Sequence, residues 1–223
     1  MGLFERLQTK GISVELLINV WKELGLKKTA KDIKVYPWAR GVDSVKKNPN
    51  TCLFATTITQ ERKETLGWKF FFPIPQIRAE SNNHLIALKS KKLKFTDMTE
   101  LAGFSGKFGV VRGDVGASLL SEAGVTKQKL DPTTDPLKLV KKLNAGRIEV
   151  VSYSFDTVTA KMIEAGIDPN KYEVIFSFPP KPMGYACHHQ MDDELINKMQ
   201  TALDKVTSSG KASEIREKYL TTE

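Results

Sequence analysis

Residues 108–124 read FGVVRGDVGASLLSEAG, which is a short apolar run, a turn and a helical segment in succession. The pattern predicts a strand over Phe108–Val111 and a helix over residues 116–122 that ends at Gly124. The same alternation continues downstream with a helix over Pro136–Asn144, a strand over Ile148–Tyr153 and a helix over Thr157–Ala165. Repeated alternation of this kind favours an α/β fold with parallel sheets and helices on their faces.

Upstream of this block, four apolar residues share one face of an amphipathic helix, with Ser13 as the candidate N-cap and Gly25 as the end: Leu17, Val20, Trp21 and Leu24. Two short strands, Ile33–Tyr36 and Cys52–Thr57, are expected to follow, and residues 40–47 between them can form a further helix.

Two Pro-marked segments, near residue 75 and near residue 180, flank the central α/β block, which includes a strand over His84–Lys89. After the second segment come short extended runs and a last helix from Asp192 to Gly210. We therefore expect two lobes joined by two crossing segments: residues 86–181 form an inserted lobe, and residues 1–85 with 182–223 form a discontinuous one.

The chain is basic, with 34 Lys and Arg against 26 Asp and Glu and a formal charge of +8, which favours anionic partners through the long-range field. The densest basic run, Lys89–Lys94, has no interleaved aromatic residues to stack on bases, so a solvated face is expected and nucleic-acid binding is not. No stretch approaches the roughly 20 apolar residues of a membrane-spanning helix. Met1–Lys10 lacks the pattern of a secretory signal.

Metal and cofactor motifs are missing. Cys52 and Cys187 have no zinc-ligand spacing, and they are compatible either with one disulfide in an oxidising compartment or with two buried free thiols. His188 and His189, taken as neighbours in a strand, would point to opposite faces and could not share a metal. We expect neither a metal nor a cofactor.

Catalytic motifs are missing as well. Gly103–Gly106 is not a nucleophile elbow, and there is no Gly-rich phosphate loop. Arg112-Gly-Asp114 spells an adhesion tripeptide but is better explained as the turn between a strand and a helix. These absences argue against an enzyme.

Four segments resemble, in order, family 3 of the bacterial extracellular solute-binding proteins. They are Gly11-Ile-Ser-Val-Glu15-Leu-Leu followed by Gly25; Tyr36-Pro-Trp-Ala-Arg40; Thr57-Ile-Thr59-Gln-Glu-Arg62 leading to Trp68 and Phe72-Pro73; and Gly109-Val-Val-Arg-Gly113 with Gly146-Arg-Ile-Glu149. The resemblance covers nearly the whole chain from residue 11 onward.

The resemblance implies a type 2 periplasmic-binding-protein-like fold, in which two strand crossovers form a hinge and the lobes close on a small polar ligand. The ligand is expected to carry a carboxylate, as an amino acid or a related organic acid does, and to be delivered to an ABC transporter permease in the membrane. The protein is then expected to be a periplasmic or extracellular monomer.

The resemblance also implies site residues. Arg62 matches the family's ligand-binding arginine, whose guanidinium can hold a carboxylate with two parallel hydrogen bonds. Thr57 matches a ligand-contacting position and is otherwise an ordinary strand residue. Trp38 and Arg40, together with Tyr36, are expected to line the cleft, although a buried Trp is more often part of a core.

In the second lobe, the turn Gly113–Gly116 matches a place where backbone N–H groups meet an anion. Asp114 and Val115 replace the family's hydroxyl residues there, and a carboxylate would repel an anion. Ser154 stands where amino-acid receptors have the Asp that pairs with the ligand's amino group. Asp156 can substitute for it, or can simply cap the following helix.

The N-terminus departs from the family, because Met1–Lys10 holds no convincing strand where a first strand is expected. The chain is then either truncated or lacks a central strand in its first lobe.

Two other functions remain open. An enzyme on the same fold, such as a dehydratase or a peptidoglycan lyase, would need an acid or base from Glu61, Asp114 or Glu149. A sensory ligand-binding module has the same sequence features as a transport receptor.

Overall fold

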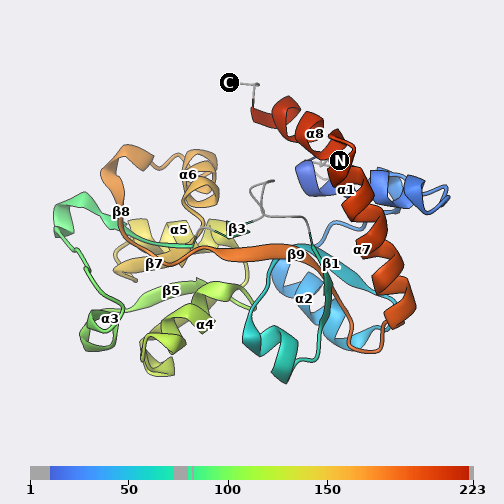
Figure 1. The fold of residues 1–223 in the computed structure, drawn as a ribbon. Coiled ribbons are helices and arrows are strands. Elements are labelled where there is room, and N and C mark those ends of the chain that lie inside the picture. Colours follow the sequence, from blue (N-terminus) through green and yellow to red (C-terminus); the bar gives the residue numbers. More distant parts are fainter. Residues whose placement is uncertain (1–10, 73–79, 82, 221–223) are drawn as a thin grey trace, which may run out of the picture. The chain divides into compact units, whose positions relative to one another are not determined.

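The computed structural model describes residues 11–72, 80–81 and 83–220, which form two compact units, each with its own sheet (Figure 1). Unit 1 takes the described residues of Met1–Tyr36, Asp43–Glu80 and Pro182–Glu223. Unit 2 takes those of Pro37–Val42 and Ser81–Lys181. The sequence analysis placed the first boundary at 85/86, whereas the units divide at 80/81.

Unit 1 is built around one strand that the chain reaches late. Strand β9 (Lys181–Cys187) pairs antiparallel with both β1 (Cys52–Thr57) and β2 (Lys69–Phe71), and β3 (Glu80–Ser81) also pairs with it. The helices of this part are α1 (Ile12–Glu23), η1 (Ala30–Asp32), α2 (Trp38–Lys47), η2 (Glu61–Thr65), α7 (Asp193–Ser208) and α8 (Lys211–Leu220). The first residues of α2, up to Val42, belong to unit 2.

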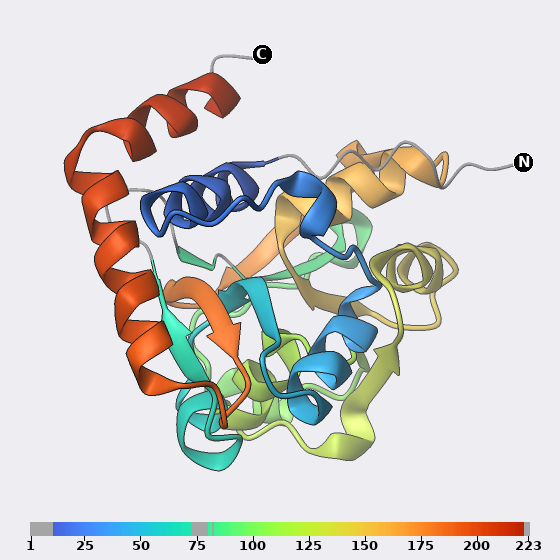
Figure 2. The same ribbon diagram turned by 90° about the vertical axis from the view of Figure 1, so that its right-hand side faces the viewer.

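The core of unit 1 lies between this sheet and the helices α1 and α7, which pack against each other (Figure 2). The rings of Phe71 and Tyr185, from neighbouring strands, are stacked with centroids 4.5 Å apart. The Tyr185 hydroxyl donates to the Ser13 carbonyl oxygen over 2.6 Å, so a buried phenol is satisfied and ties α1 to the central strand.

A disulfide joins Cys52 and Cys187, which are register partners at the ends of β1 and β9. Of the two alternatives left open by the sequence, the structure has the bonded one. The bond links positions 135 residues apart, so it fixes the return of the chain to unit 1 covalently.

Unit 2 contains a five-stranded mixed sheet in the order β6-β5-β7-β4-β8. Strand β5 (Phe108–Val111) runs parallel to β6 (Leu130–Thr133) and β7 (Val150–Tyr153), whereas β4 (His84–Leu88) runs antiparallel to β7 and to β8 (Tyr172–Ser177). Its helices are η4 (Lys89–Lys91), α3 (Glu100–Gly103), α4 (Val115–Glu122), η5 (Lys127–Lys129), α5 (Pro136–Asn144), α6 (Phe155–Glu164) and η6 (Pro169–Lys171).

The strands of unit 2 bury alternate residues on two faces, as the two-residue period of a strand requires. Val110 joins one core cluster with Leu119 of α4, and Val111 joins the other with Leu139 of α5 and Met162 of α6. Helix α4 therefore covers one face of the sheet, and α5 and α6 cover the other (Figure 1).

Several predicted elements are confirmed to the residue, including Cys52–Thr57, Phe108–Val111 and Pro136–Asn144, whose N-cap Asp135 accepts from the Lys138 N–H. The prediction of parallel sheets is wrong for unit 1 and for β4 and β8. The predicted strand Ile33–Tyr36 is also wrong, because these residues form no ladder.

Two further predictions fail, one about a helix cap and one about the histidine pair. Gly11, and not Ser13, is the N-cap of α1. The histidine pair lies after the end of β9 rather than in a strand, and the rings of His188 and His189 pack with centroids 4.1 Å apart instead of pointing to opposite faces. The predictions about Met1–Lys10 fall outside the described residues.

Removing the disulfide should weaken unit 1 without changing its fold. Cross-linking residues 135 apart lowers the entropy of the unfolded chain by an amount worth about 5 kcal/mol, and measured effects are usually about 2 to 4 kcal/mol. The double variant Cys52→Ala with Cys187→Ala should lose free energy of unfolding in this range in urea titrations. Reducing agent should reproduce the loss in the unchanged chain and should not affect the variant; equal stability of all forms would contradict the prediction.

Gly116→Ala should destabilise unit 2. An added Cβ would lie 2.8 Å from both the carbonyl oxygen and Oγ of Ser152, which is buried and donates to Asn83 Oδ1. Because the contact involves backbone, we expect a loss of about 1 to 3 kcal/mol in thermal or urea unfolding. Gly103→Ala is the matched control, since its Cβ would meet nothing within 4 Å. An equal change in both variants would show that the close approach to Ser152 does not matter.

Candidate functional site

The loops after β5 and β7 leave the sheet of unit 2 toward opposite faces. Strand β5 leads into α4, which packs in one core cluster, and the neighbouring parallel strand β7 leads into α6, which packs in the other. In open α/β sheets, ligands bind outside the carboxyl ends of strands where the connections diverge in this way. We call residues 112–116 and 153–156 the switch point of unit 2.

Asp114 is one of the two acidic residues of the switch point, with Asp156. It is the N-cap of α4, and its Oδ1 accepts from the Gly116 N–H over 3.1 Å. Burial, and secondarily the Asp114 carboxylate, raise the pKa of Tyr153. One backbone N–H group at the start of α4 is therefore already bonded to Asp114. The negative charge of Asp114 also disfavours an anion at this place. Both observations argue against the expected backbone contact with an anionic ligand. The Val115 side chain packs into the core and leaves only its backbone for a ligand.

Ser154 and Asp156 have roles different from those expected. Ser154 is the N-cap of α6, its Oγ accepting from the Thr157 N–H over 3.5 Å, so the prediction that Asp156 caps this helix is wrong. Asp156 is exposed in the first turn. Burial lowers the pKa of His84, and the charge of Asp156 opposes that shift. Asp156 is thus close enough to His84, the partner of Tyr153 on β4, to affect its pKa.

Trp38 is half-buried against the core cluster that holds α5 and α6, and its Nε1 is buried without an acceptor among the described residues. A buried donor without a partner is costly and usually has water or a ligand atom nearby. Arg40, two residues later, is exposed, as is Tyr36. Of the three predicted cleft residues, Trp38 has the environment of a candidate site.

In unit 1, the structure brings Thr57 and Arg62 into direct contact. Strand β1 is bulged between Leu53 and Thr56 and has Ala55 in the left-handed region at a φ of 54°, a conformation that is unfavourable for alanine. The strand ends at Thr57, and the chain turns into η2, which presents Arg62. Bulges and strained residues of this kind are common beside functional sites.

Arg62 is only 5% exposed although it carries a permanent charge. Its Nη1 donates to the Thr57 carbonyl oxygen over 2.6 Å, its backbone N–H donates to Thr59 Oγ1, and its guanidinium lies 5.8 Å from the ring centre of Trp68. Contact with an aromatic face and with a carbonyl oxygen offsets part of the cost of burying the charge. The guanidinium is therefore held in one place, as a group that recognises a ligand must be.

Sequence reasoning assigned no role to Tyr153, which ends β7 at the switch point and is half-buried. The signal was its place as the last residue of a predicted strand. Trp68 was part of the matched pattern, but its packing on Arg62 could not be read from the spacing alone.

Groups that would indicate other chemistry were not found in the described part of the chain. Among residues 11–72, 80–81 and 83–220, no group of three or more His, Cys, Asp or Glu residues is arranged to hold a metal ion. No helix in these ranges is long and apolar enough to cross a membrane.

Several solved structures resemble this chain over most of its length. A histidine kinase sensor domain with similarity to periplasmic binding proteins matches with a TM-score of 0.74 and 18% identity over 95% of this chain and 86% of its own. The arginine-, lysine-, histidine-binding protein ArtJ from Geobacillus stearothermophilus matches with a TM-score of 0.73 and 22% identity over 96% and 87%. An ancestral amino-acid-binding protein, a precursor of cyclohexadienyl dehydratase, matches with a TM-score of 0.67 and 19% identity over 94% and 85%.

These likenesses show the mixed α/β fold of periplasmic binding proteins, with two sheets. No sequence among the curated proteins matches at a significant level. Residues 4–222, almost the entire chain, match the family described as bacterial extracellular solute-binding proteins, family 3. The chain belongs to this family.

Proposed function

We propose that this protein is a receptor that captures a small carboxylate-bearing solute and delivers it to an ABC transporter permease, acting as a monomer in the periplasm or outside the cell. The observation that carries the proposal is the buried Arg62, fixed by the Thr57 carbonyl oxygen and by Trp68. Membership of the solute-binding family supports the class of function. The disulfide supports an oxidising compartment.

Arg62 suits a carboxylate for geometric reasons. A guanidinium has five N–H donors in a planar fork, and two of them match the two oxygens of a carboxylate in parallel. The Nη1 bond to Thr57 and the contact with the Trp68 ring restrict this fork, so a ligand carboxylate would meet a partly oriented group. Orienting the fork in advance reduces the entropy that binding would otherwise lose.

The charges of the switch point decide which chemical groups this part of unit 2 could hold. Ser154 supplies no negative charge where an amino-acid receptor would have an Asp, and its Oγ is already used as a cap. Asp114, at the adjacent strand end, and the exposed Asp156 are the carboxylates of the switch point. We propose that the switch point favours a positively charged group, such as an amino group, and disfavours an anionic one.

An enzyme is less well supported than a receptor. Catalysis by paired carboxylates needs both groups at one reaction centre. Glu149 precedes β7 and accepts from the Lys107 N–H, so it lies at the amino end of the strands, whereas Asp114 lies at their carboxyl end. Glu61 is exposed on η2. One structural neighbour is a precursor of a dehydratase, so an enzymatic function is still worth testing. The sensor domain among the neighbours similarly favours a sensory module as the second candidate.

Thermal unfolding against a panel of amino acids, their deaminated acids, their decarboxylated amines and small dicarboxylates tests the receptor. A ligand at 100 times its dissociation constant adds about 2.7 kcal/mol. At about 2 to 4 °C per kcal/mol for a chain of this length, Tm should rise by about 5 to 10 °C. A compound that keeps the carboxylate should stabilise the protein, and the corresponding decarboxylated amine should not.

Variants at Arg62 identify the anchor. Arg62→Lys keeps the charge but not the fork, and should lower affinity at least tenfold; Arg62→Ala should abolish the shift. Both need their own melting curve without ligand, because Arg62 is buried. Arg147→Ala, on an exposed arginine of unit 2, is the control and should bind as the unchanged chain does. A stabilising ligand unaffected by both Arg62 variants would refute this anchor, and consumption of a ligand would indicate an enzyme.

A further inference from the structure

Unit 1 has a strongly basic surface that the proposed function does not use. Five lysines lie within fifteen residues after the middle of α1, and all of them are exposed: Lys22, Lys27, Lys28, Lys31 and Lys34. The carboxylates of this stretch are Glu23 and Asp32, so residues 22–36 carry five positive and two negative charges, a net charge of +3. We call this surface the basic segment.

The same segment exposes apolar side chains. Leu26 is 41% exposed, Val35 is 54% exposed and Tyr36 is 36% exposed, and these are three of the seven large hydrophobic residues found exposed in the described chain. Leu26 lies between Lys22 and Lys27 in the sequence, and Val35 and Tyr36 follow Lys34, so the exposed apolar side chains are few and are interspersed with charges. A protein interface usually has a well-packed apolar centre that is depleted of charged residues, and three such side chains among five lysines do not provide one.

The backbone of the basic segment is held in place. Lys28 Nζ lies 5.7 Å from the ring centre of Trp21, which keeps the segment close to α1. Thr29 and Asp32 form a reciprocal capping box around η1, and this uses the Asp32 carboxylate. The lysines are therefore presented by ordered structure, with one of the two opposing charges engaged in a cap.

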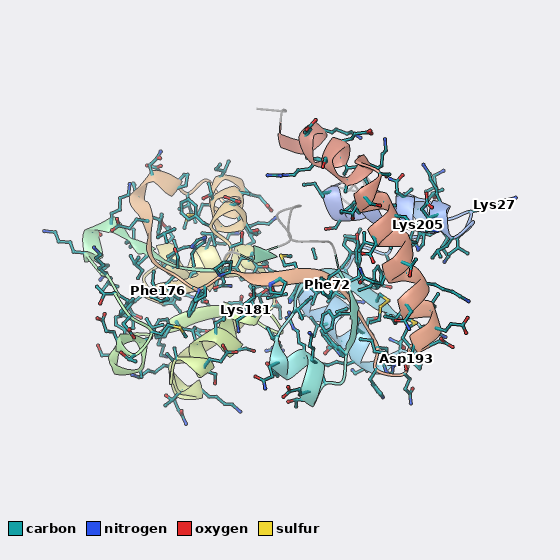
Figure 3. All side chains as sticks on the ribbon, in the orientation of Figure 1. Lys27, Phe72, Phe176, Lys181, Asp193 and Lys205 are labelled. Atoms are coloured by element: carbon teal, nitrogen blue, oxygen red, sulfur yellow. A yellow bond between two sulfur atoms is a disulfide. The ribbon has the colours of Figure 1, made fainter. Side chains whose placement is uncertain are left out.

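Helix α7 packs against α1, next to the start of the basic segment. The end of α1, at Glu23 and Leu24, and α7 line a common surface hollow of about 330 Å³ that includes Lys205. Lys27 and Lys205 lie at the same end of unit 1 (Figure 3). Lys198, also in the hollow, is paired with Glu194 over 2.6 Å, and Glu23 balances the charge of Lys205, so the hollow adds no net charge to the basic segment.

A second basic run in the chain provides a comparison. Lys89, Lys91, Lys92 and Lys94 are all exposed, but the apolar residue among them, Leu93, is half-buried, and none of the exposed large hydrophobic residues belongs to this run. The two runs therefore differ in exposed apolar side chains more than in charge.

We propose that the basic segment binds the surface of an anionic membrane, with lysines at the lipid phosphates and with Leu26 and Val35 inserted at the headgroup boundary. Basic residues interspersed with single exposed apolar side chains are the features of interfacial binding. Such contact would hold the protein at the membrane, where a solute released from it has the shortest distance to a transporter.

Co-sedimentation of the full chain with phosphatidylcholine vesicles, with and without phosphatidylglycerol, tests the proposal. The unchanged chain should bind only the anionic vesicles, and binding should fall as salt rises. Changing Lys27, Lys28, Lys31 and Lys34 together to Gln should lower the partition coefficient on the order of a hundredfold or more at low salt. Leu26→Ser with Val35→Ser should weaken binding but keep its salt dependence.

The matched control changes Lys89, Lys91, Lys92 and Lys94 to Gln, which removes the same charge from the other run. Melting curves should first show that all variants fold. Equal losses in the two quadruple variants would mean that net charge alone drives binding and would overturn the proposal. Failure of the unchanged chain to bind anionic vesicles would also overturn the proposal. An acidic protein would then be the better candidate partner of the basic segment.

Discussion

The pairing of β9 with β1 and β2 is the constraint on which unit 1 depends, because the centre of its sheet arrives more than 100 residues after its neighbours in the chain. All of unit 2 between Ser81 and Lys181 is inserted before this strand, so unit 1 cannot be completed from its N-terminal part alone. Late pairing of this kind costs loop-closure entropy before any contact is gained. The Cys52–Cys187 bond reduces that cost once formed, since it joins the same two strands. Close packing adds to the constraint: a Cβ on Gly184 of β9 would lie 2.5 Å from the Phe72 Cβ and 2.8 Å from the Phe71 carbonyl oxygen.

In unit 2, the parallel strands and the helices between them follow one another in sequence, and side-chain caps begin several helices, such as Asp135 before α5 and Ser154 before α6. Strand β4 is the exception, because its partners β7 and β8 come much later in the chain. The divergence of α4 and α6 to opposite faces of the sheet creates the switch point without any special residue. What is particular to this chain is the charge placed there. Asp114 gives the start of α4 a negative charge where helix N–H groups would otherwise favour an anion. The switch point of unit 2 therefore favours a cation, whereas Arg62 in unit 1 favours an anion.

Much of the fold could be predicted from the sequence because apolar period and capping residues are local signals. They predicted Cys52–Thr57, Phe108–Val111 and Pro136–Asn144 exactly. They missed β6, since Pro132 reads against a strand and is tolerated here because β6 is at the edge of the sheet. They also predicted a strand at Ile33–Tyr36, where the residues are extended but have no partner strand, and Val35 is exposed. A strand requires a neighbour, and the period of one segment carries no information about its neighbours.

The candidate site shows the same limit at the level of single side chains. The family resemblance identified Arg62 and Thr57 as two ligand contacts, but not the bond between them. That bond runs from the guanidinium to a backbone carbonyl oxygen, which every residue type possesses, so Thr57 needs no hydroxyl for it. Burial of Arg62 against Trp68 means that part of its effect on the protein is structural. A guanidinium placed only for stability would be satisfied equally well by any set of acceptors, whereas one placed for a ligand must keep its fork oriented. The bulged strand and the left-handed Ala55 precede η2, which presents Arg62, and backbone strain next to this arginine agrees with the ligand-binding role proposed for it.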